Sequence, residues 1–378
     1  MYYNDFKGLS LSALGMGTMR LPVIDRDNAR IDEKKTAEMV AYAIEQGINY
    51  FDTAWGYHAG NSEIVMGRVL SAYPRESYYL ASKFPGYDVS TFEKKEEVFA
   101  RQLEKCGVEY FDFYLFHNVC EKNIDYYLDE KYGLADFLLE KKREGKIRHL
   151  GFSVHGEYET TRRFLEAYGD ICEFCQIQLN WLDYSFQDAK SKVDMLRERS
   201  IPIWVMEPVR GGALASLSEA DEALLRERHA DMTVPEWAFR YIQTFPDCTV
   251  TLSGMSNFEQ LRENIATFSE RRPLSSSDVE LLYSIADGIV KANNVPCTAC
   301  RYCTEKCPMG LDIPRLISLY NEFNYSGGGF RAPMVISTLP EDKRPSACIG
   351  CRGCEAVCPQ VIKISEIMST FSAKLSKG

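Results

Sequence analysis

The sequence predicts an α/β protein whose larger part is a closed (β/α)8 TIM barrel, followed by a smaller, mainly helical domain that is rich in cysteine. Short β-branched or aromatic runs alternate with amphipathic stretches as far as residue 268, which indicates βα units and a parallel sheet. Eight such units fit a closed barrel better than an open doubly wound sheet. No G-x-G-x-x-G follows the first apolar run, which weakens the open dinucleotide-binding alternative.

Each expected strand is a short β-branched or aromatic run, and each expected helix carries apolar residues three to four positions apart. The strands are expected at residues 11–19, 49–53, 78–83, 111–117, 149–154, 174–179, 203–206 and 250–253. The helices are expected at residues 34–45, 63–71, 92–106, 134–144, 160–167, 190–199, 235–244 and 258–266.

The chain is predicted to divide into three parts. The barrel is expected over residues 1–268, a linker and helix over 269–294, and the cysteine-rich domain over 295–378. Residues 271–277 are polar and contain proline, which is typical of a linker.

The composition excludes several classes of partner. With 45% hydrophobic and 26% charged residues the chain resembles ordinary soluble proteins, and no apolar run is long enough to cross a membrane. The formal net charge of -10 disfavours nucleic acid. The N-terminus has neither a basic nor an apolar signal region, so we expect a cytoplasmic protein.

Two cysteine runs near the C-terminus have the spacing C-x2-C-x2-C-x3-C-P, which bacterial ferredoxins use to hold [4Fe-4S] clusters. Zinc is disfavoured because a third cysteine lies inside each run and no histidine is near. Disulfides would need an oxidising compartment. The predicted cluster ligands are Cys297, Cys300, Cys303 and Cys307 in one run, and Cys348, Cys351, Cys354 and Cys358 in the other.

Titratable residues end three consecutive expected strands. Asp52 ends the second strand, Lys83 the third and His117 the fourth, while Tyr57 lies in the loop after Asp52. The C-terminal ends of barrel strands form one face, where barrel enzymes carry their active sites. We therefore expect these four side chains to meet at the barrel mouth.

The segment Phe51-Asp52-Thr53-Ala54-Trp55-Gly56-Tyr57 is similar to the D-T-A-x-x-Y signature of aldo-keto reductases. Lys83 and the segment Tyr114-Leu115-Phe116-His117 extend this resemblance. The chain thus resembles an aldo-keto reductase with a C-terminal two-cluster ferredoxin domain. The resemblance implies a catalytic tetrad of Asp52, Tyr57, Lys83 and His117, which reduces a small-molecule carbonyl with a nicotinamide hydride.

The ferredoxin resemblance also implies crossed ligation. One cluster would be held by three cysteines of the first run and the last cysteine of the second, and the other cluster by the reverse set. The first set is Cys297, Cys300, Cys303 and Cys358, and the second is Cys348, Cys351, Cys354 and Cys307.

Elementary chemistry assigns each tetrad residue a role. Hydride addition leaves negative charge on the carbonyl oxygen, so a positioned proton donor lowers the barrier. We expect Lys83 to lower the pKa of Tyr57, Asp52 to pair with Lys83, and His117 to orient the substrate oxygen.

Family resemblance also implies a nucleotide site along the later strand ends. Ser153 and Gln178 would hold the nicotinamide carboxamide, although Gln178 fits a buried structural glutamine equally well. The residues Ser256 and Glu259 also fit a helix capping box. The full set of expected nucleotide contacts is Ser153, Gln178, Asn180, Met206, Arg210, Gly211, Gly254, Ser256, Gln260, Glu263 and Asn264.

Two choices of cofactor stay open. Ser256 and Gln260 replace the basic residues that usually clasp a 2'-phosphate, so the nucleotide is NADP(H) or NAD(H). A flavin ordinarily couples hydride to one-electron transfer, and a barrel mouth can hold one without a motif, but the sequence shows no flavin motif.

The sequence therefore predicts an NAD(P)-dependent oxidoreductase that reduces a carbonyl by hydride transfer and carries a two-cluster electron-transfer domain. We expect a redox partner protein for the clusters. The alternative is a nucleotide-binding redox sensor or electron-transfer subunit with little carbonyl turnover.

Overall fold

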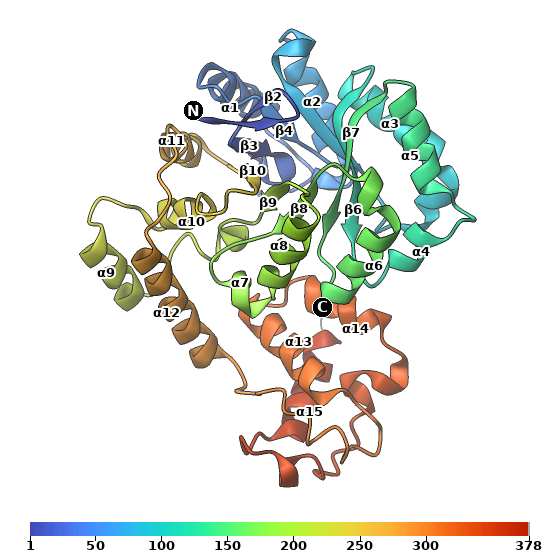
Figure 1. Cartoon of the computed structure of the whole chain (residues 1–378), viewed down its shortest axis with the longest axis vertical. Helices are drawn as coiled ribbons and strands as arrows, with labels where there is room; N and C mark the ends of the chain where they lie inside the picture. The colour runs from blue at the N-terminus through green and yellow to red at the C-terminus, as the bar shows by residue number, and fades with distance from the viewer. Residues whose placement is uncertain (377–378) are drawn as a thin grey trace. The chain divides into compact units, whose positions relative to one another are not determined.

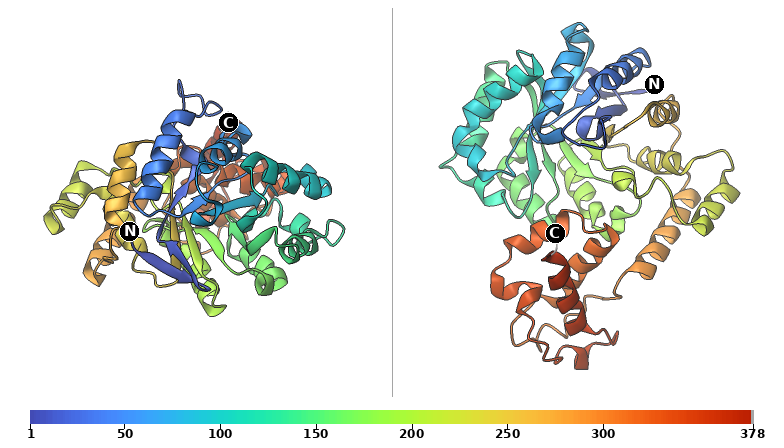
Figure 2. Two further views of the ribbon diagram at one scale, coloured as in Figure 1. Left: turned by 90° about the horizontal axis from the view of Figure 1, so that it is seen from above. Right: turned by 180° about the vertical axis from the view of Figure 1, so that it is seen from behind.

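The computed structural model describes residues 1–376. The chain forms two compact units, one spanning Met1–Tyr283 and the other beginning at Ser284. Figure 1 shows the first unit from blue to orange-brown and the second in orange to red, and Figure 2 gives two further views.

The first unit is built on a closed barrel whose strand order is β10-β3-β4-β5-β6-β7-β8-β9. Every pair of neighbouring strands in it is parallel. This arrangement confirms the predicted (β/α)8 fold. The barrel strands are β3 (Leu14–Gly17), β4 (Tyr50–Asp52), β5 (Tyr79–Phe84), β6 (Phe111–Val119), β7 (Ile147–Val154), β8 (Cys175–Gln178), β9 (Ile203–Met206) and β10 (Cys248–Ser253).

The start of the chain differs from the prediction. The single strand expected over residues 11–19 is wrong, because an antiparallel hairpin of β1 (Tyr3–Phe6) and β2 (Leu9–Ser12) precedes β3. Lys7 and Gly8 turn this hairpin with φ of 53° and 84°. Phe6 lies 5.0 Å from the Trp204 ring in the apolar barrel interior, so the hairpin helps to fill that interior.

Helices surround the barrel strands (Figures 1 and 2). The eight expected helices are present, with ends shifted by a few residues. They are α1 (Glu33–Glu45), α2 (Ser62–Leu70), α3 (Lys95–Cys106), α5 (Leu134–Arg143), α6 (Tyr158–Tyr168), α8 (Ala189–Glu198), α10 (Val234–Ile242) and α11 (Phe258–Thr267).

Three further helices have no counterpart in the prediction: α4 (Ile124–Leu128), α7 (Asp183–Phe186) and α9 (Glu219–Arg228). The first two are too short to show an apolar period. The third buries only Leu225, and its start is fixed by Ser218, whose hydroxyl accepts from the Asp221 amide.

The second unit is mainly helical, as predicted. Its helices are α13 (Ile313–Tyr325), α14 (Arg331–Thr338) and α15 (Ile364–Leu375), and its buried core combines their apolar faces with Cys303 and Cys354. The helix α12 (Ser276–Asn293) runs across the boundary between the units. Its first half belongs to the barrel unit, since the Tyr283 and Tyr241 hydroxyls lie 3.0 Å apart. The predicted boundaries at 268 and 294 stay a prediction.

Within residues 1–376, the structure has no helix that is both long and apolar enough to cross a membrane.

Candidate active site and cluster-binding cysteines

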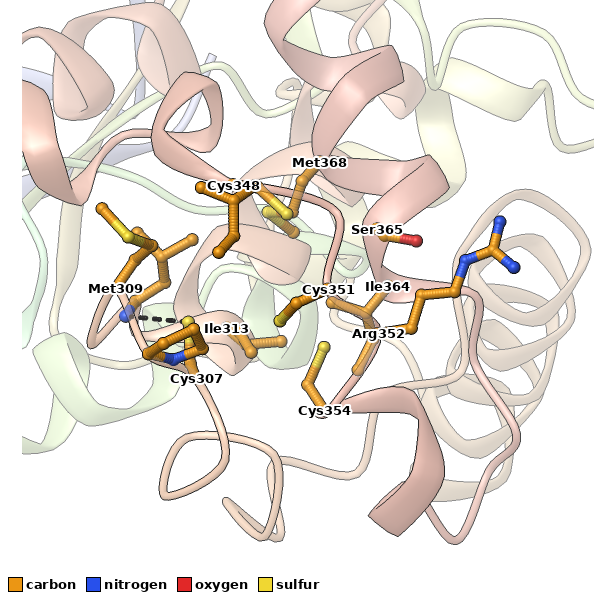
Figure 3. A pocket seen from close by; sticks show the side chains of 13 residues that line it. Cys307, Met309, Ile313, Cys348, Cys351, Arg352, Cys354, Ile364, Ser365 and Met368 are labelled. Carbon is orange, nitrogen blue, oxygen red and sulfur yellow. Dashed lines mark hydrogen bonds between the residues drawn. The ribbon is translucent and has the colours of Figure 1, made fainter.

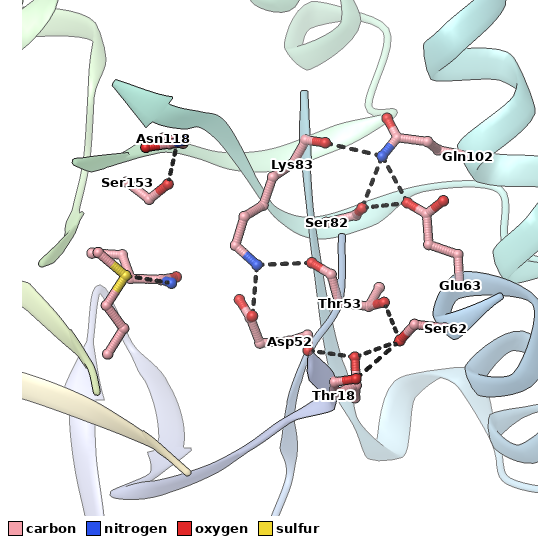
Figure 4. A network of polar contacts seen from close by, with 12 residues as sticks. Thr18, Asp52, Thr53, Ser62, Glu63, Ser82, Lys83, Gln102, Asn118 and Ser153 are labelled. Carbon is pink, nitrogen blue, oxygen red and sulfur yellow. Dashed lines mark hydrogen bonds and ion pairs between the residues drawn. The ribbon is translucent and has the colours of Figure 1, made fainter. Parts of the chain in front are cut away.

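The barrel mouth places a buried ion pair at the ends of two neighbouring strands. Asp52 ends β4 and Lys83 lies near the end of β5, and both side chains are almost completely buried. The Lys83 ammonium donates to Asp52 Oδ1 at 2.6 Å and to the Thr53 carbonyl at 2.8 Å (Figure 4). Burial lowers the pKa of Lys83 and raises the pKa of Asp52, and each partner opposes the shift of the other.

A second polar network holds the backbone of Lys83 from behind (Figure 4). Gln102 on α3 donates to the Lys83 carbonyl at 3.0 Å and to Glu63 Oε1 at 2.7 Å. Glu63 on α2 is fully buried and also accepts from Ser82 at 2.7 Å and from Lys105 at 3.2 Å. This network is absent from the prediction, although a charged residue facing inward from a helix was a usable signal.

Hydroxyl groups fix the end of β4 on its other side. Thr18 Oγ1 donates to the Asp52 carbonyl at 2.9 Å and lies 2.7 Å from Ser62 Oγ. The same Ser62 hydroxyl lies 2.9 Å from Thr53 Oγ1. Asp52 is therefore held through both its carboxylate and its backbone.

The structure brings all four predicted tetrad residues together. Lys83 Nζ lies 5.1 Å from the centre of the Tyr57 ring, and that ring lies 6.1 Å from the His117 ring. Tyr87 approaches His117 from another side at 5.4 Å. Among the described residues, none hydrogen-bonds to His117 Nδ1, which is buried.

The electrostatics correct one expectation. The pKa of Tyr57 is raised well above 10.0, because burial and the carboxylates of Asp52 and Glu207 disfavour the phenolate. The predicted lowering of this pKa by Lys83 is therefore wrong in this structure, where Lys83 is paired with Asp52. Burial, Lys83 and His155 lower the pKa of His117 well below 6.5. The site thus holds a protonated phenol beside a neutral imidazole.

The residues expected to bind nicotinamide lie at the ends of β7, β8 and β9. Ser153 is buried, and its hydroxyl oxygen accepts from the Asn118 amide at 2.8 Å. Gln178 Nε2 and Asn180 Nδ2 each donate to Asp183 Oδ2 at 2.7 Å. Met206 Sδ lies 3.6 Å from Gln176 Nε2.

Arg210, one of the expected nucleotide contacts, is buried. Its side chain is 5% exposed, and its Nε lies 3.0 Å from both oxygens of Asp183. The following Gly211 and Gly212 have φ of 65° and 103°. The guanidinium that reaches this surface belongs to Arg20: a Cβ on Gly211 would lie 2.9 Å from Arg20 Nη2.

Arg20 also passes Gly254, where a Cβ would lie 3.1 Å from Arg20 Cβ. Gly254 therefore allows the close approach of this exposed arginine, whereas the flexible Arg20 guanidinium could move away from a side chain at Gly211. An isolated arginine carries no motif, which is why the sequence did not indicate it.

The segment before α11 also differs from the prediction. The capping box at Ser256 and Glu259 is wrong, because Asn257 Oδ1 caps the helix by accepting from the Gln260 amide at 2.9 Å. Ser256 instead donates from its hydroxyl to the Arg20 carbonyl at 2.8 Å. Further along α11, the partly buried Glu263 precedes Asn264, which donates to Ser253 at 3.1 Å.

In the second unit the eight predicted cysteines line two cavities. One cavity contains Cys307, Cys348, Cys351 and Cys354 (Figure 3). The other contains Cys297, Cys300, Cys303 and Cys358. This division is the crossed one, with the last cysteine of each run joining the other run, and Ile364 lines both cavities.

The backbone around both cavities repeats the same conformation. Positive φ occurs at Ala299 (53°) and Arg301 (66°) in the first run, and at Gly350 (70°) and Arg352 (59°) in the second. Alternation of this kind turns successive N–H groups toward one point, which suits an anionic cluster. The Leu311 amide also donates to Cys307 Sγ at 3.5 Å.

These thiols fit a cluster better than a single ion. In residues 1–376, no three His, Cys, Asp or Glu side chains converge closely enough for one metal ion. All thirteen cysteines are free thiols rather than disulfides. Four thiols around an otherwise mostly apolar cavity suit an iron–sulfur cluster, which four cysteine thiolates hold.

Comparison with known families agrees with both units. Residues 13–287 match the family model described as aldo/keto reductase family. The chain belongs to this family. In this aldo/keto reductase the second unit is a 4Fe-4S domain, since residues 296–362 match the model described as 4Fe-4S dicluster domain.

Curated relatives of this aldo/keto reductase include the NADH-specific methylglyoxal reductase of Escherichia coli, which is 26% identical over 74% of this chain and 96% of the relative. The L-galactose dehydrogenase of Arabidopsis thaliana is 27% identical over 71% of this chain and 87% of the relative. Among solved structures, the aldo-keto reductase AKR11C1 of Bacillus halodurans shares the fold with a TM-score of 0.62, at 23% identity over 75% of this chain and 96% of that one.

Proposed function

We propose that this chain reduces a small carbonyl compound by hydride transfer from NADH or NADPH at the mouth of its barrel. The observation that carries the proposal is the meeting of Tyr57 and His117 beside the buried Lys83–Asp52 pair. A bound nicotinamide supplies the hydride. The residues of the chain then have to hold the carbonyl and deliver a proton to its oxygen.

Tyr57 is proposed as the proton donor. Its raised pKa keeps the phenol protonated at neutral pH, and Lys83 beside its ring compensates the negative charge that develops on proton loss. The neutral His117 ring is proposed to donate a hydrogen bond to the carbonyl oxygen from Nε2, which leaves the unpartnered Nδ1 without a proton.

The nucleotide is proposed to lie across the ends of β7 to β10. Ser153 and Gln178 are suited to its carboxamide, and the exposed Arg20 between Gly211 and Gly254 is suited to its phosphates. NADH is proposed as the preferred form, because Ser256 and Gln260 hydrogen-bond within the chain and carry no positive charge. The E. coli relative is named as NADH-specific, which supports this preference.

The two cysteine-lined cavities are proposed to hold one [4Fe-4S] cluster each. Such clusters move single electrons, so we propose that they exchange electrons with a one-electron carrier protein. The four thiols in each cavity and the repeated backbone conformation support two clusters.

Anaerobically purified protein tests this proposal. Iron and sulfide are measured first, and NADH and NADPH oxidation is then followed with a panel of small aldehydes and ketones. We expect carbonyl-dependent oxidation, which Tyr57→Phe abolishes without weakening nucleotide binding. Tyr110→Phe, a matched change near the start of β6, keeps full activity.

If the protein binds the nucleotide but no carbonyl oxidises it, the proposed carbonyl reductase activity is wrong. The alternative of a nucleotide-binding redox sensor is then favoured. The same assay is repeated with an artificial one-electron acceptor. Nucleotide oxidation that needs this acceptor and no carbonyl would indicate an electron-transfer subunit rather than a carbonyl reductase or a redox sensor.

A further inference from the structure

Three polar side chains converge at the ends of β8 and β9 on one buried carboxylate. Asp183 is completely buried and accepts from Gln178 and Asn180 through Oδ2. Arg210 Nε reaches both of its oxygens at 3.0 Å. Asn180 also accepts a hydrogen bond, because the backbone amide of Asp183 donates to its Oδ1 at 2.8 Å. The tetrad chemistry uses none of these bonds.

This carboxylate fixes the direction of the Gln178 amide. A carboxylate paired with arginine only accepts hydrogen bonds, so Gln178 must turn its NH2 group toward Asp183. The carbonyl oxygen of Gln178 is then the atom left for a ligand. Gln178 is partly exposed, whereas Asp183 and Asn180 are fully buried.

Ser153, on the neighbouring strand β7, offers a hydrogen-bond donor where Gln178 offers an acceptor. The Ser153 hydroxyl oxygen accepts from the Asn118 amide at 2.8 Å, which leaves its proton free to donate. A donor at Ser153 and an acceptor at Gln178 complement a primary carboxamide, which offers one carbonyl oxygen and one NH2 group.

We propose that Asp183 is a positioning residue for the nucleotide: it orients Gln178 so that the site accepts a hydrogen bond from the carboxamide NH2 of nicotinamide. This inference rests on the proposed function and deepens it. Asp183 acts only through Gln178 and does not touch the nucleotide.

Asp183 also anchors the segment after β9. Glu207 and Arg210 have φ of 55° and 48°, a backbone conformation that residues other than glycine rarely adopt. The Asp183–Arg210 pair ties this segment to α7. A variant that removes the carboxylate alone takes one ion-pair partner from a buried guanidinium, so the test needs a charge-balanced variant as well.

The test compares the dissociation constants of NAD+ and its 3-acetylpyridine analogue, in which a methyl group replaces the carboxamide NH2. Loss of one hydrogen bond is expected to make the analogue bind about tenfold more weakly to the wild-type protein. Asp183→Asn is expected to bring the ratio of the two constants near one, because the Gln178 amide can then turn around. Gln178→Met is expected to have the same effect.

The double variant Asp183→Asn with Arg210→Gln removes both buried charges and replaces the single variant if that one fails to fold. Asp194→Asn, a charge-matched change at a partly exposed position on α8, is expected to keep the wild-type ratio. If Asp183 had a purely structural role, its substitution would weaken the binding of both nucleotides equally. An unchanged ratio of the two dissociation constants in the Asp183 variants would therefore overturn the inference.

If the wild-type protein binds both nucleotides equally well, the inference is wrong and the proposed function stands. If it binds neither nucleotide, both are wrong.

Discussion

At the scale of single residues, the charged groups of the barrel mouth pair with each other and leave Tyr57, the proposed proton donor, un-ionised. The Lys83 ammonium is hydrogen-bonded to Asp52 and to the Thr53 carbonyl. Its positive charge therefore does not ionise Tyr57 before the reaction. Burial then keeps Tyr57 protonated and His117 neutral. The site is therefore preorganised for an oxygen that gains negative charge during the reaction.

This arrangement predicts a flat pH profile. Tyr57 donates only when protonated, and its raised pKa means that this form is lost only well above pH 10.0. His117 is neutral until pH falls well below 6.5, because its pKa is lowered. We expect kcat for carbonyl reduction to change less than about twofold between these limits. A fall in the kcat of the wild-type protein with an apparent pKa near 8 would contradict the assignment.

At the scale of elements, α2 and α3 hold β5 through buried polar groups rather than through apolar contacts alone. Glu63 on α2 and Gln102 on α3 meet at 2.7 Å behind the strand that carries Lys83. Tyr114 extends the network by donating to Gln102 Oε1 at 2.6 Å. Helix and strand positions are coupled to the geometry of the tetrad by these bonds.

Replacing Glu63 with alanine should therefore be costly. The change leaves Lys105 and the amide of Gln102 without their buried acceptor, so we expect the free energy of unfolding to fall by about 3 kcal/mol. Chemical denaturation measures this change. Glu97→Ala, an exposed change on α3, should lower it by less than about 0.5 kcal/mol. Equal effects of the two substitutions would show that the buried network contributes nothing to stability.

The sequence could predict the elements that repeat a pattern. Seven of the barrel strands and the eight longer helices that were expected followed from alternating runs, and the candidate tetrad and cysteines followed from motifs. The N-terminal hairpin was missed because Leu11 continues into β3 without a break in apolar character. Arg20 and Glu63 were missed because each depends on contacts between segments far apart in the chain. Asp183 was missed because a single acidic residue near Gln178 and Asn180 carries no motif.

At the scale of the whole molecule, a hydride-transfer barrel and a cluster domain share one chain. With the crossed grouping of cysteines, each proposed cluster would depend on both cysteine runs. The two runs cannot then function as independent modules.

Crossed ligation is tested by replacing the last cysteine of the second run and comparing it with one replaced cysteine from the body of each run. Cys358→Ser is expected to disturb the cluster that Cys297 also binds, although the two residues belong to different runs. The spectroscopic change should match that of Cys297→Ser and differ from that of Cys351→Ser, as measured by electron paramagnetic resonance of the reduced protein. A match between Cys358→Ser and Cys351→Ser would contradict the crossed arrangement.

The central claim is that the carbonyl carbon receives its hydrogen directly from the nucleotide. The most direct measurement uses NADH deuterated at both C4 positions with an accepted carbonyl substrate, in ordinary water, followed by mass spectrometry of the alcohol. We predict one deuterium on the carbinol carbon in every product molecule. Product alcohol without deuterium would show that electrons leave the nucleotide by another route, and would contradict direct hydride transfer at the Tyr57 site.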